Sequence, residues 1–204
     1  MKKFVLDNCM NIITNNKQYD DIKLAEIKYG LETLYLTFSK LIIIGILAAI
    51  LGLFKELLIF LLIYNIIRMP SFGLHATKSW ICLLSSTLTF IGIPLIIKNI
   101  ELNIITKIII GIIFTIHMSI FSPADTHKRP IVNKKRRKIY KILSTIISII
   151  YVILSIIIKN TYISNCFIFA IILQNILISP ITYKIFKLPY NNYKEYIKTH
   201  GLNY

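Results

Sequence analysis

Acidic residues and cysteines are scarce in this sequence. Its 204 residues contain nine Asp and Glu against 24 Lys and Arg, and its three cysteines are Cys9, Cys82 and Cys166. Cysteines this few and this far apart predict neither a disulfide framework nor a Cys-rich zinc site, and they fit a reducing cytoplasm. The sequence also lacks a glycine-rich phosphate loop, a dinucleotide fingerprint and a zinc-protease helix motif. We therefore expect no metal and no cofactor.

Apolar residues and positive charge are both abundant. The composition is 55% hydrophobic, the formal net charge is +15 and the mean hydropathy is +0.67. Soluble single-domain proteins rarely combine these properties, so we predict an all-α, polytopic membrane protein with one integral-membrane domain over residues 1–204. Membrane topology accounts for the positive charge, and nucleic-acid binding is not expected. Residues 1–20 lack a long apolar run before a cleavage site, so we expect no secretory signal peptide.

Hydrophobic periodicity predicts an N-terminal amphipathic helix over residues 20–40, lying on the inner membrane surface. About six transmembrane helices follow, over residues 41–54, 57–69, 80–97, 104–121, 142–158 and 162–180. The second would be about 20 Å long, short for a hydrocarbon core of about 30 Å. It must thin the bilayer, draw in flanking residues or be partly re-entrant. Pro94 is expected to kink the far end of the third span.

Charge segregation predicts the orientation of these spans. With six spans, 20 of the 24 Lys and Arg fall on one side of the membrane, eight of them in a basic loop at 122–141. The positive-inside rule places this loop in the cytoplasm, together with both termini, His75 and Cys82. The loop could act as a topology anchor, bind anionic lipid or attract an acidic peptide.

The stretch from Arg68 to Ser86 brings a histidine and a cysteine to the start of an apolar run. A nucleophilic cysteine needs a base or a positive field, because its thiol is mostly protonated at neutral pH. In one straight helix, His75 and Cys82 would lie about 10.5 Å apart along the axis, too far for a hydrogen bond. The sequence must therefore break between them if they act together.

Turn and capping residues supply such a break. Pro70 and Gly73 favour a turn, and Thr77 or Ser79 is suited to cap a new helix. With Ser79 as the cap, Cys82 becomes the third helical residue. Unpaired backbone N–H groups and the positive end of the helix dipole would then favour a thiolate and could hold an oxyanion.

Other interpretations of this stretch remain open. A lone His and a lone Cys near a membrane surface are common without catalysis, and a metal site would need further ligands nearby. Cys166 is most simply a small buried hydrophobe. Ser85, Ser86 and Thr89 form a polar stripe that would line the path of a peptide transporter or export channel without proteolysis, but the spans lack an acidic proton relay. A non-catalytic membrane anchor would leave His75 and Cys82 without a purpose.

Three motifs resemble the accessory gene regulator protein B (AgrB) family. The first is Arg68, Gly73-Leu-His75 and Cys82 ahead of a Ser-rich membrane helix; the second is SPADTHKRPIVNKKRR at 122–137; the third is LPYNNY at 188–193. The resemblance extends over essentially the whole chain. It implies a multi-pass cysteine endopeptidase of the bacterial cell membrane, functioning as a homodimer in quorum sensing. Its substrate would be an AgrD-like propeptide, whose C-terminal part is removed on the way to a cyclic thiolactone autoinducing peptide.

The same resemblance implies roles for individual residues. Cys82 corresponds to the nucleophile and His75 to its base, while Arg68 and Gly73 match further motif positions. Many members have two glycines where this chain has Phe72-Gly73, which puts a copied turn geometry in doubt. Candidates for a third catalytic residue are Ser85, Ser86 and Asp125. Possible contacts with the propeptide are these three residues together with Lys134, Lys135, Arg136 and Arg137.

Overall fold

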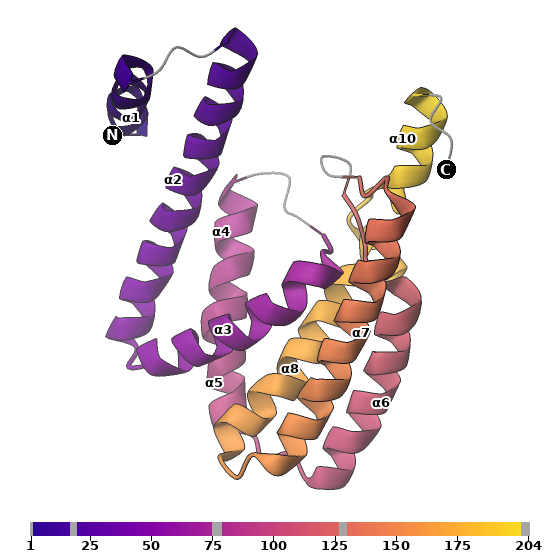
Figure 1. Cartoon of the computed structure of the whole chain (residues 1–204). Coiled ribbons are helices and arrows are strands. Elements are labelled where there is room, and N and C mark those ends of the chain that lie inside the picture. The colour runs from indigo at the N-terminus through magenta and orange to yellow at the C-terminus, as the bar shows by residue number, and fades with distance from the viewer. Residues whose placement is uncertain (1, 17–19, 75–78, 127–129, 201–204) are drawn as a thin grey trace. The chain divides into compact units, whose positions relative to one another are not determined.

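The computed structural model describes residues 2–16, 20–74, 79–126 and 130–200. The chain divides into two compact units, Met1–Gly52 and Leu53–Tyr204. Helices α1 (Lys2–Asn16) and α2 (Asp21–Ile50) lie in the first unit. The second contains α3 (Phe54–Ser71), α4 (Ser79–Thr87), a π-helical turn η1 (Leu88–Gly92), α5 (Ile93–Lys98), α6 (Ile104–Phe121), α7 (Lys134–Ile157), α8 (Thr161–Ile178), α9 (Pro180–Ile185) and α10 (Asn192–His200) (Figure 1). The described residues are thus helical, as the sequence predicted.

Helix α2 joins two segments that the sequence analysis separated. The expected amphipathic helix at 20–40 and the expected span at 41–54 form one continuous helix, of which Ile27–Ile50 is long and apolar enough to cross a membrane. No proline interrupts this stretch, so the helix continues through residue 40 and through Gly45. It ends before Gly52, whose φ of 67° is typical of a glycine at a helix C-terminus.

Helices α6 and α7 have their polar side chains inside and their apolar side chains outside. Along α7 the buried residues are Ser144, Ser148, Tyr151 and Ser155, at helical spacing. The outward faces carry exposed isoleucines: Ile105, Ile109, Ile112, Ile116, Ile142, Ile146, Ile149 and Ile153. This pattern is the reverse of that in a soluble bundle and is typical of helices surrounded by lipid.

Hydroxyl pairs and one glycine bring α6 and α7 close together. Thr115 Oγ1 lies 2.7 Å from Ser148 Oγ, and Ser122 Oγ lies 2.6 Å from Ser144 Oγ. At Gly111, an added Cβ would lie 2.6 Å from Val152 Cγ2. Small residues of this kind let two membrane helices approach closely.

Gly111→Ala is expected to destabilise the protein by about 1–3 kcal/mol, because the stiff Val152 side chain leaves no room for a methyl group. The control is Gly92→Ala, since an added Cβ there meets nothing within 4 Å. Thermal unfolding in detergent should show a lower midpoint for Gly111→Ala alone, and Val152→Ala should restore part of the loss. Equal midpoints for the two glycine variants would contradict this close packing.

Helix α8 is the central helix of the second unit and packs against α3, α5, α6 and α7. Its buried residues include apolar Ile168, Ala170 and Ile171, and also the amides Asn165, Gln174 and Asn175. Amides inside a membrane bundle require internal partners. Asn175 Oδ1 lies 2.8 Å from His117 Nδ1, and Asn165 Nδ2 donates to the carbonyl of Ile100 at 2.7 Å.

Helix α3 crosses α7 and α8 obliquely and contains the expected short span 57–69 (Figure 1). At one end of α3, Tyr162 at the start of α8 donates to the Glu56 carbonyl at 2.9 Å. At its other end, Arg68 donates to the Leu74 carbonyl, and the Leu74 N–H donates to Leu177 at the end of α8. α3 therefore reaches from one end of the bundle to the other, partly covered by protein. Together with five helices long and apolar enough to cross a membrane, it agrees with about six spans.

The expected third span is a helix interrupted by a π-helical turn. Ser79–Lys98 is long enough to cross a membrane, and η1 separates α4 from α5 within it. Pro94 follows directly after this turn, and a proline ring clashes with the carbonyl four residues earlier, here that of Phe90 in η1. The disturbance predicted at Pro94 thus lies in the turn just before it.

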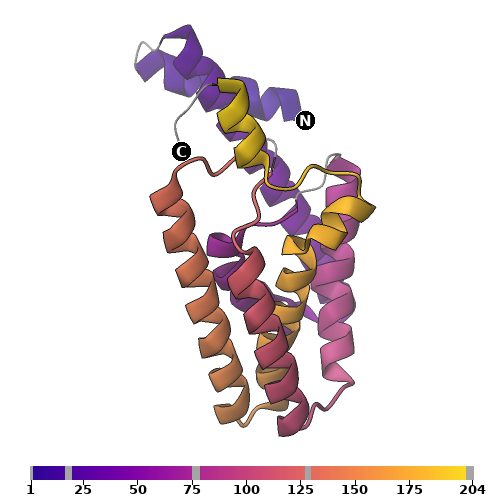
Figure 2. The same ribbon diagram turned by 90° about the vertical axis from the view of Figure 1, so that its right-hand side faces the viewer.

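The two ends of the bundle differ in charge. We call the end at which α4 and α7 begin and α6 and α8 end the Cys82 end (Figures 1 and 2). It carries Lys134, Lys135, Arg136, Arg137, Lys138 and Lys141 in the first two turns of α7, whereas the opposite end carries Lys55, Lys98, Lys107 and Lys159. α7 begins at Lys134, inside the expected loop 122–141, because the Asn133 side chain caps it by accepting from the Arg136 N–H at 3.0 Å.

Candidate active site

Cys82 lies in the first turn of α4. The helix begins at Ser79, so Cys82 is its fourth residue, one place later than predicted with Ser79 as the cap. Its side chain is half-buried, and Ser85 Oγ donates to its carbonyl at 3.1 Å. The first four N–H groups of a helix have no partner within it, and the helix dipole is positive there. Backbone groups beside this thiol can therefore stabilise a negative charge.

His75 lies outside the described residues, as does Thr77, but the segment that leads to His75 is described. Three hydrogen bonds hold Phe72, Gly73 and Leu74. The Gly73 N–H donates to the Ala124 carbonyl at 2.8 Å, the Leu74 N–H donates to the Leu177 carbonyl at 3.0 Å, and Gln174 Nε2 donates to the Phe72 carbonyl at 2.7 Å. Residues 72–74 are thus fixed to the α6–α7 connection and to α8.

Arg68 fastens this segment from α3. Its guanidinium donates to the Tyr64 hydroxyl at 2.8 Å and to the Leu74 carbonyl at 3.0 Å, and it lies 5.7 Å from the centre of the Tyr64 ring. A planar guanidinium holds two acceptors in a fixed geometry, which a lysine does not. Arg68 therefore holds the last described residue before His75.

Gly73 occupies a position that other residues do not fit. Its φ is 107°, in the region that favours glycine, and an added Cβ would lie 3.0 Å from the carbonyl oxygen of Leu177. Phe72 also has a positive φ, 57°, and its ring meets that of Tyr140 edge to face at 5.2 Å. The backbone thus turns sharply just before His75.

The serines of the expected polar stripe lie on α4. Ser85 is exposed and Ser86 is half-buried. Ser85 donates to Cys82, as described, and Thr87 donates to the Leu83 carbonyl at 2.9 Å. Of the stripe residues, Ser85 therefore has its hydroxyl bonded to its own helix and does not require a water-filled path.

Asp125 is buried, with 1% of its surface exposed, and its carboxylate is bound within the chain. Oδ2 accepts from the Tyr193 N–H at 2.9 Å and from the Ile131 N–H at 3.3 Å, and it pairs with Arg137 at 3.5 Å. Lys134, Lys135 and Arg136 are exposed at the Cys82 end, whereas Arg137 is half-buried. Asp125 and Arg137 bind each other.

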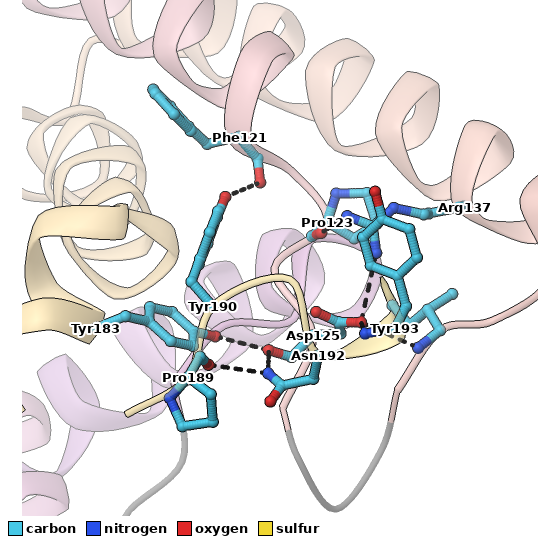
Figure 3. A network of polar contacts seen from close by, with 10 residues as sticks. Phe121, Pro123, Asp125, Arg137, Tyr183, Pro189, Tyr190, Asn192 and Tyr193 are labelled. Carbon is cyan, nitrogen blue, oxygen red and sulfur yellow. Dashed lines mark hydrogen bonds and ion pairs between the residues drawn. The ribbon is translucent and has the colours of Figure 1, made fainter. Parts of the chain in front are cut away.

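The residues around Asp125 from the C-terminal segment were not singled out from the sequence. Tyr183 and Asn192 donate to the Asp125 carbonyl, and Tyr190 donates to the Phe121 carbonyl (Figure 3). Burial raises the pKa of Tyr190 to about 12 and also raises the pKa of Tyr183, so both hydroxyls stay protonated and donate at neutral pH. The LPYNNY motif was the only signal of this contribution.

Comparisons with known proteins agree with the motifs. A sequence model described as Accessory gene regulator B matches residues 6–178. A putative AgrB-like protein of Listeria monocytogenes serovar 1/2a is 31% identical over 188 residues, covering 91% of each chain. One from Clostridium acetobutylicum is 29% identical, covering 92% of this chain and 90% of the relative. The Accessory gene regulator protein B of Staphylococcus aureus (strain Newman) is 32% identical, covering 77% of this chain and 82% of the relative.

No solved structure matches the chain. The family match nevertheless covers most of the sequence, and it includes Arg68, Gly73, His75, Cys82 and Asp125. The chain belongs to the accessory gene regulator B family.

Proposed function

We propose that this protein is a membrane-embedded cysteine endopeptidase of an accessory gene regulator quorum-sensing system. Its substrate is an AgrD-like propeptide. It removes the C-terminal part of this propeptide on the way to a cyclic thiolactone autoinducing peptide. One observation carries the proposal: residues 72–74, fastened by Arg68, end one residue before His75, and Cys82 follows in the first turn of a new helix. The described backbone thus turns at Phe72 and Gly73, just before His75, and a separate described helix carries Cys82.

The reaction begins with the Cys82 thiolate, formed when His75 takes the thiol proton. The sulfur attacks the scissile carbonyl carbon, a C–S bond forms, and the resulting oxyanion is held by N–H groups of the first turn of α4. His75 then gives its proton to the leaving nitrogen, and the C–N bond breaks. The C-terminal fragment leaves, and the N-terminal part stays on Cys82 as a thioester.

A cysteine thiol within the propeptide completes the second step. It gives its proton to His75 and attacks the thioester carbonyl; the ring C–S bond forms, the bond to Cys82 sulfur breaks, and the released thiolate takes the proton back from His75. One thioester is exchanged for another, so little bond energy is lost, provided that water does not hydrolyse the intermediate first. The lipid-facing isoleucines around the bundle are consistent with a site that limits access of water.

Mass spectrometry of a liposome reaction tests this function. Purified full-length protein is incubated with a synthetic AgrD-like propeptide, and the expected products are a C-terminal fragment and a cyclic product lighter than the linear acid by one water. A covalent adduct on Cys82 should be trapped at early times. Uptake of intact propeptide into the liposomes without any fragment would instead favour the transporter.

We further propose that the Cys82 end faces the cytoplasm, because it carries the cluster of cations at the start of α7. Two exposed positions at opposite ends test this: Lys135→Cys and Glu101→Cys, each in a chain whose native cysteines are replaced by serine. A membrane-impermeant maleimide should label intact cells at position 101 and should label position 135 only after permeabilisation. The reverse pattern would overturn the orientation.

The remaining expectations about partners belong to this proposal as well. The exposed cations Lys134, Lys135 and Arg136 lie where they would meet anionic lipid headgroups or an acidic part of the propeptide. The functional unit is proposed to be a homodimer in the bacterial cell membrane, with both termini in the cytoplasm.

A further inference from the structure

The α6–α7 connection is hydrogen-bonded on both of its edges. In an extended chain, successive peptide groups point to opposite sides. The groups of Ala124 point to the end of α3: its N–H donates to the Ser71 carbonyl at 3.1 Å, and its carbonyl accepts from the Gly73 N–H at 2.8 Å. Phe72 and Ala124 form a parallel bridge here. This edge therefore holds the segment that leads to His75.

The other edge of the connection faces the C-terminal segment and Arg137. The Asp125 carbonyl accepts from the Tyr183 hydroxyl at 3.1 Å and from Asn192 Nδ2 at 3.2 Å. The Phe121 carbonyl accepts from the Tyr190 hydroxyl at 3.3 Å, and the Pro123 carbonyl accepts from Arg137 Nη2 at 3.3 Å. Figure 3 shows these donors gathered around the connection. The Pro123 and Asp125 carbonyls, on either side of Ala124 in the chain, are thus bound on the side away from Gly73, and the Phe121 carbonyl at the end of α6 is bound as well.

The Asp125 carboxylate adds a second attachment. It accepts from the Tyr193 N–H and pairs with Arg137, whose guanidinium carbon lies 3.7 Å from the centre of the Tyr193 ring. Burial of a carboxylate is costly unless the group is paired and hydrogen-bonded, as Oδ2 is here. The Asp125 side chain therefore binds the C-terminal segment at Tyr193 and the first turn of α7 at Arg137.

We propose that Asp125 and the C-terminal latch, defined as Tyr183, Tyr190, Asn192 and Tyr193, are positioning residues for the His75–Cys82 chemistry. The latch acts through Asp125 and Ala124 on Gly73, two residues before His75. It lies outside residues 6–178 that match the family, so the comparison assigns it no role. This inference rests on the proposed function. Loosening the latch lowers the fraction of molecules with His75 in place, which lowers kcat and leaves substrate binding unchanged.

Two buried asparagines allow a matched test. Asn192 is 3% exposed and donates to the carbonyls of Asp125 and Pro189, at the Cys82 end. Asn165 is 0% exposed and donates to the Ile100 carbonyl, at the opposite end. Asn192→Ala removes one of the two donors to the Asp125 carbonyl and the side-chain donor to the Pro189 carbonyl, and Asn165→Ala removes the side-chain donor to the Ile100 carbonyl. The contact that Asn192→Ala removes is with Asp125, next to the residue that bonds Gly73, whereas the contact that Asn165→Ala removes is at the opposite end of the bundle.

The experiment compares both variants with the full-length wild type in liposomes, by propeptide cleavage and by hydrogen exchange of residues 72–74. Asn192→Ala should lower kcat about tenfold at unchanged KM and should speed exchange of the Gly73 and Leu74 amides about tenfold. Asn165→Ala should lower the thermal midpoint and leave kcat and this exchange at wild-type values. Asp125→Asn, which still accepts from Tyr193, should retain more activity than Asp125→Ala.

Equal effects of the two asparagine variants on kcat, or no effect of Asn192→Ala on either readout, would overturn the proposal. Hydrogen exchange needs no substrate, so it separates this inference from the proposed function. Faster exchange at Gly73 in Asn192→Ala, together with full cleavage by Cys82→Ser, would refute the proposed role of Cys82 and support the coupling of the latch to Gly73. Exchange as slow as in the wild type in Asn192→Ala, with cleavage that depends on Cys82, would refute the positioning role of the latch and support the peptidase.

Discussion

Cys82→Ser and His75→Ala are each expected to reduce propeptide cleavage by at least about a thousandfold while expression and membrane insertion stay unchanged. A serine hydroxyl has a far higher pKa than a thiol, is poorly activated by one histidine, and would give a stable ester in place of an exchangeable thioester. Cys82 lies in the first turn of α4 and is only half-buried, so its replacement removes little packing. Fragment yield by mass spectrometry at matched protein levels is the measurement.

The other cysteines provide the controls for this prediction. Cys9→Ser and Cys166→Ser should retain activity, although Cys166 is buried in α8 and its loss should lower stability slightly. The double variant His75→Ala with Cys82→Ser should be no worse than either single one, because the two residues act as a unit. Cleavage at the wild-type rate by Cys82→Ser would refute the mechanism in which Cys82 is the nucleophile.

Gly73→Ala is expected to have the second largest effect, because it combines two costs. The residue would have to adopt a φ of 107°, and its Cβ would lie 3.0 Å from the Leu177 carbonyl oxygen. We expect a loss of about 2–4 kcal/mol of stability, or a displaced segment, and in either case a fall in cleavage of at least about tenfold. Thermal unfolding and cleavage are measured on the same preparation.

Gly52→Ala separates the two costs. Gly52 also has a positive φ, 67°, but an added Cβ there meets nothing within 4 Å. It should cost about 1 kcal/mol and leave cleavage unchanged. If both variants lose the same stability and neither loses activity, the fit of residues 72–74 against α8 is not what places His75.

Helices with strong patterns were predictable from the sequence. The span expected at 104–121 coincides with α6, because an unbroken apolar run is flanked by Asn103, which caps the helix, and by Ser122-Pro123, which ends it. The start of α7 was harder to place. The predicted span began only at the apolar run from residue 142, so the cations before it were assigned to a loop, although Asn133 was a sufficient capping signal.

The attachment of the candidate site could not be predicted in the same way. Arg68 entered only as a member of a motif, and Gly73 only as a motif member and a turn residue, because the sequence does not state which carbonyl an arginine meets or which φ a glycine has. The contacts of residues 72–74 with Ala124 and Leu177 are made by backbone groups, which every residue carries. Such pairing leaves no pattern of side chains, so only the structure reveals it.

The departure from the two-glycine pattern has a conformational explanation. Phe72 has a φ of 57°, so the backbone at this position has the left-handed conformation that a glycine adopts without strain. The edge contact with Tyr140 and the hydrogen bond from Gln174 hold the phenylalanine there. The turn is therefore compatible with either residue at position 72, whereas position 73 tolerates only glycine.

The π-helical turn between α4 and α5 sets the direction in which Cys82 points. Pro94 and Ile97 of α5 are buried in the bundle, and Cys82 lies on the other side of the turn. A π-helical turn contains one residue more than an α-helical turn, and each residue of a helix advances the azimuth by about 100°. The number of residues in this turn therefore sets the angle about the helix axis between the thiol and the buried face of α5.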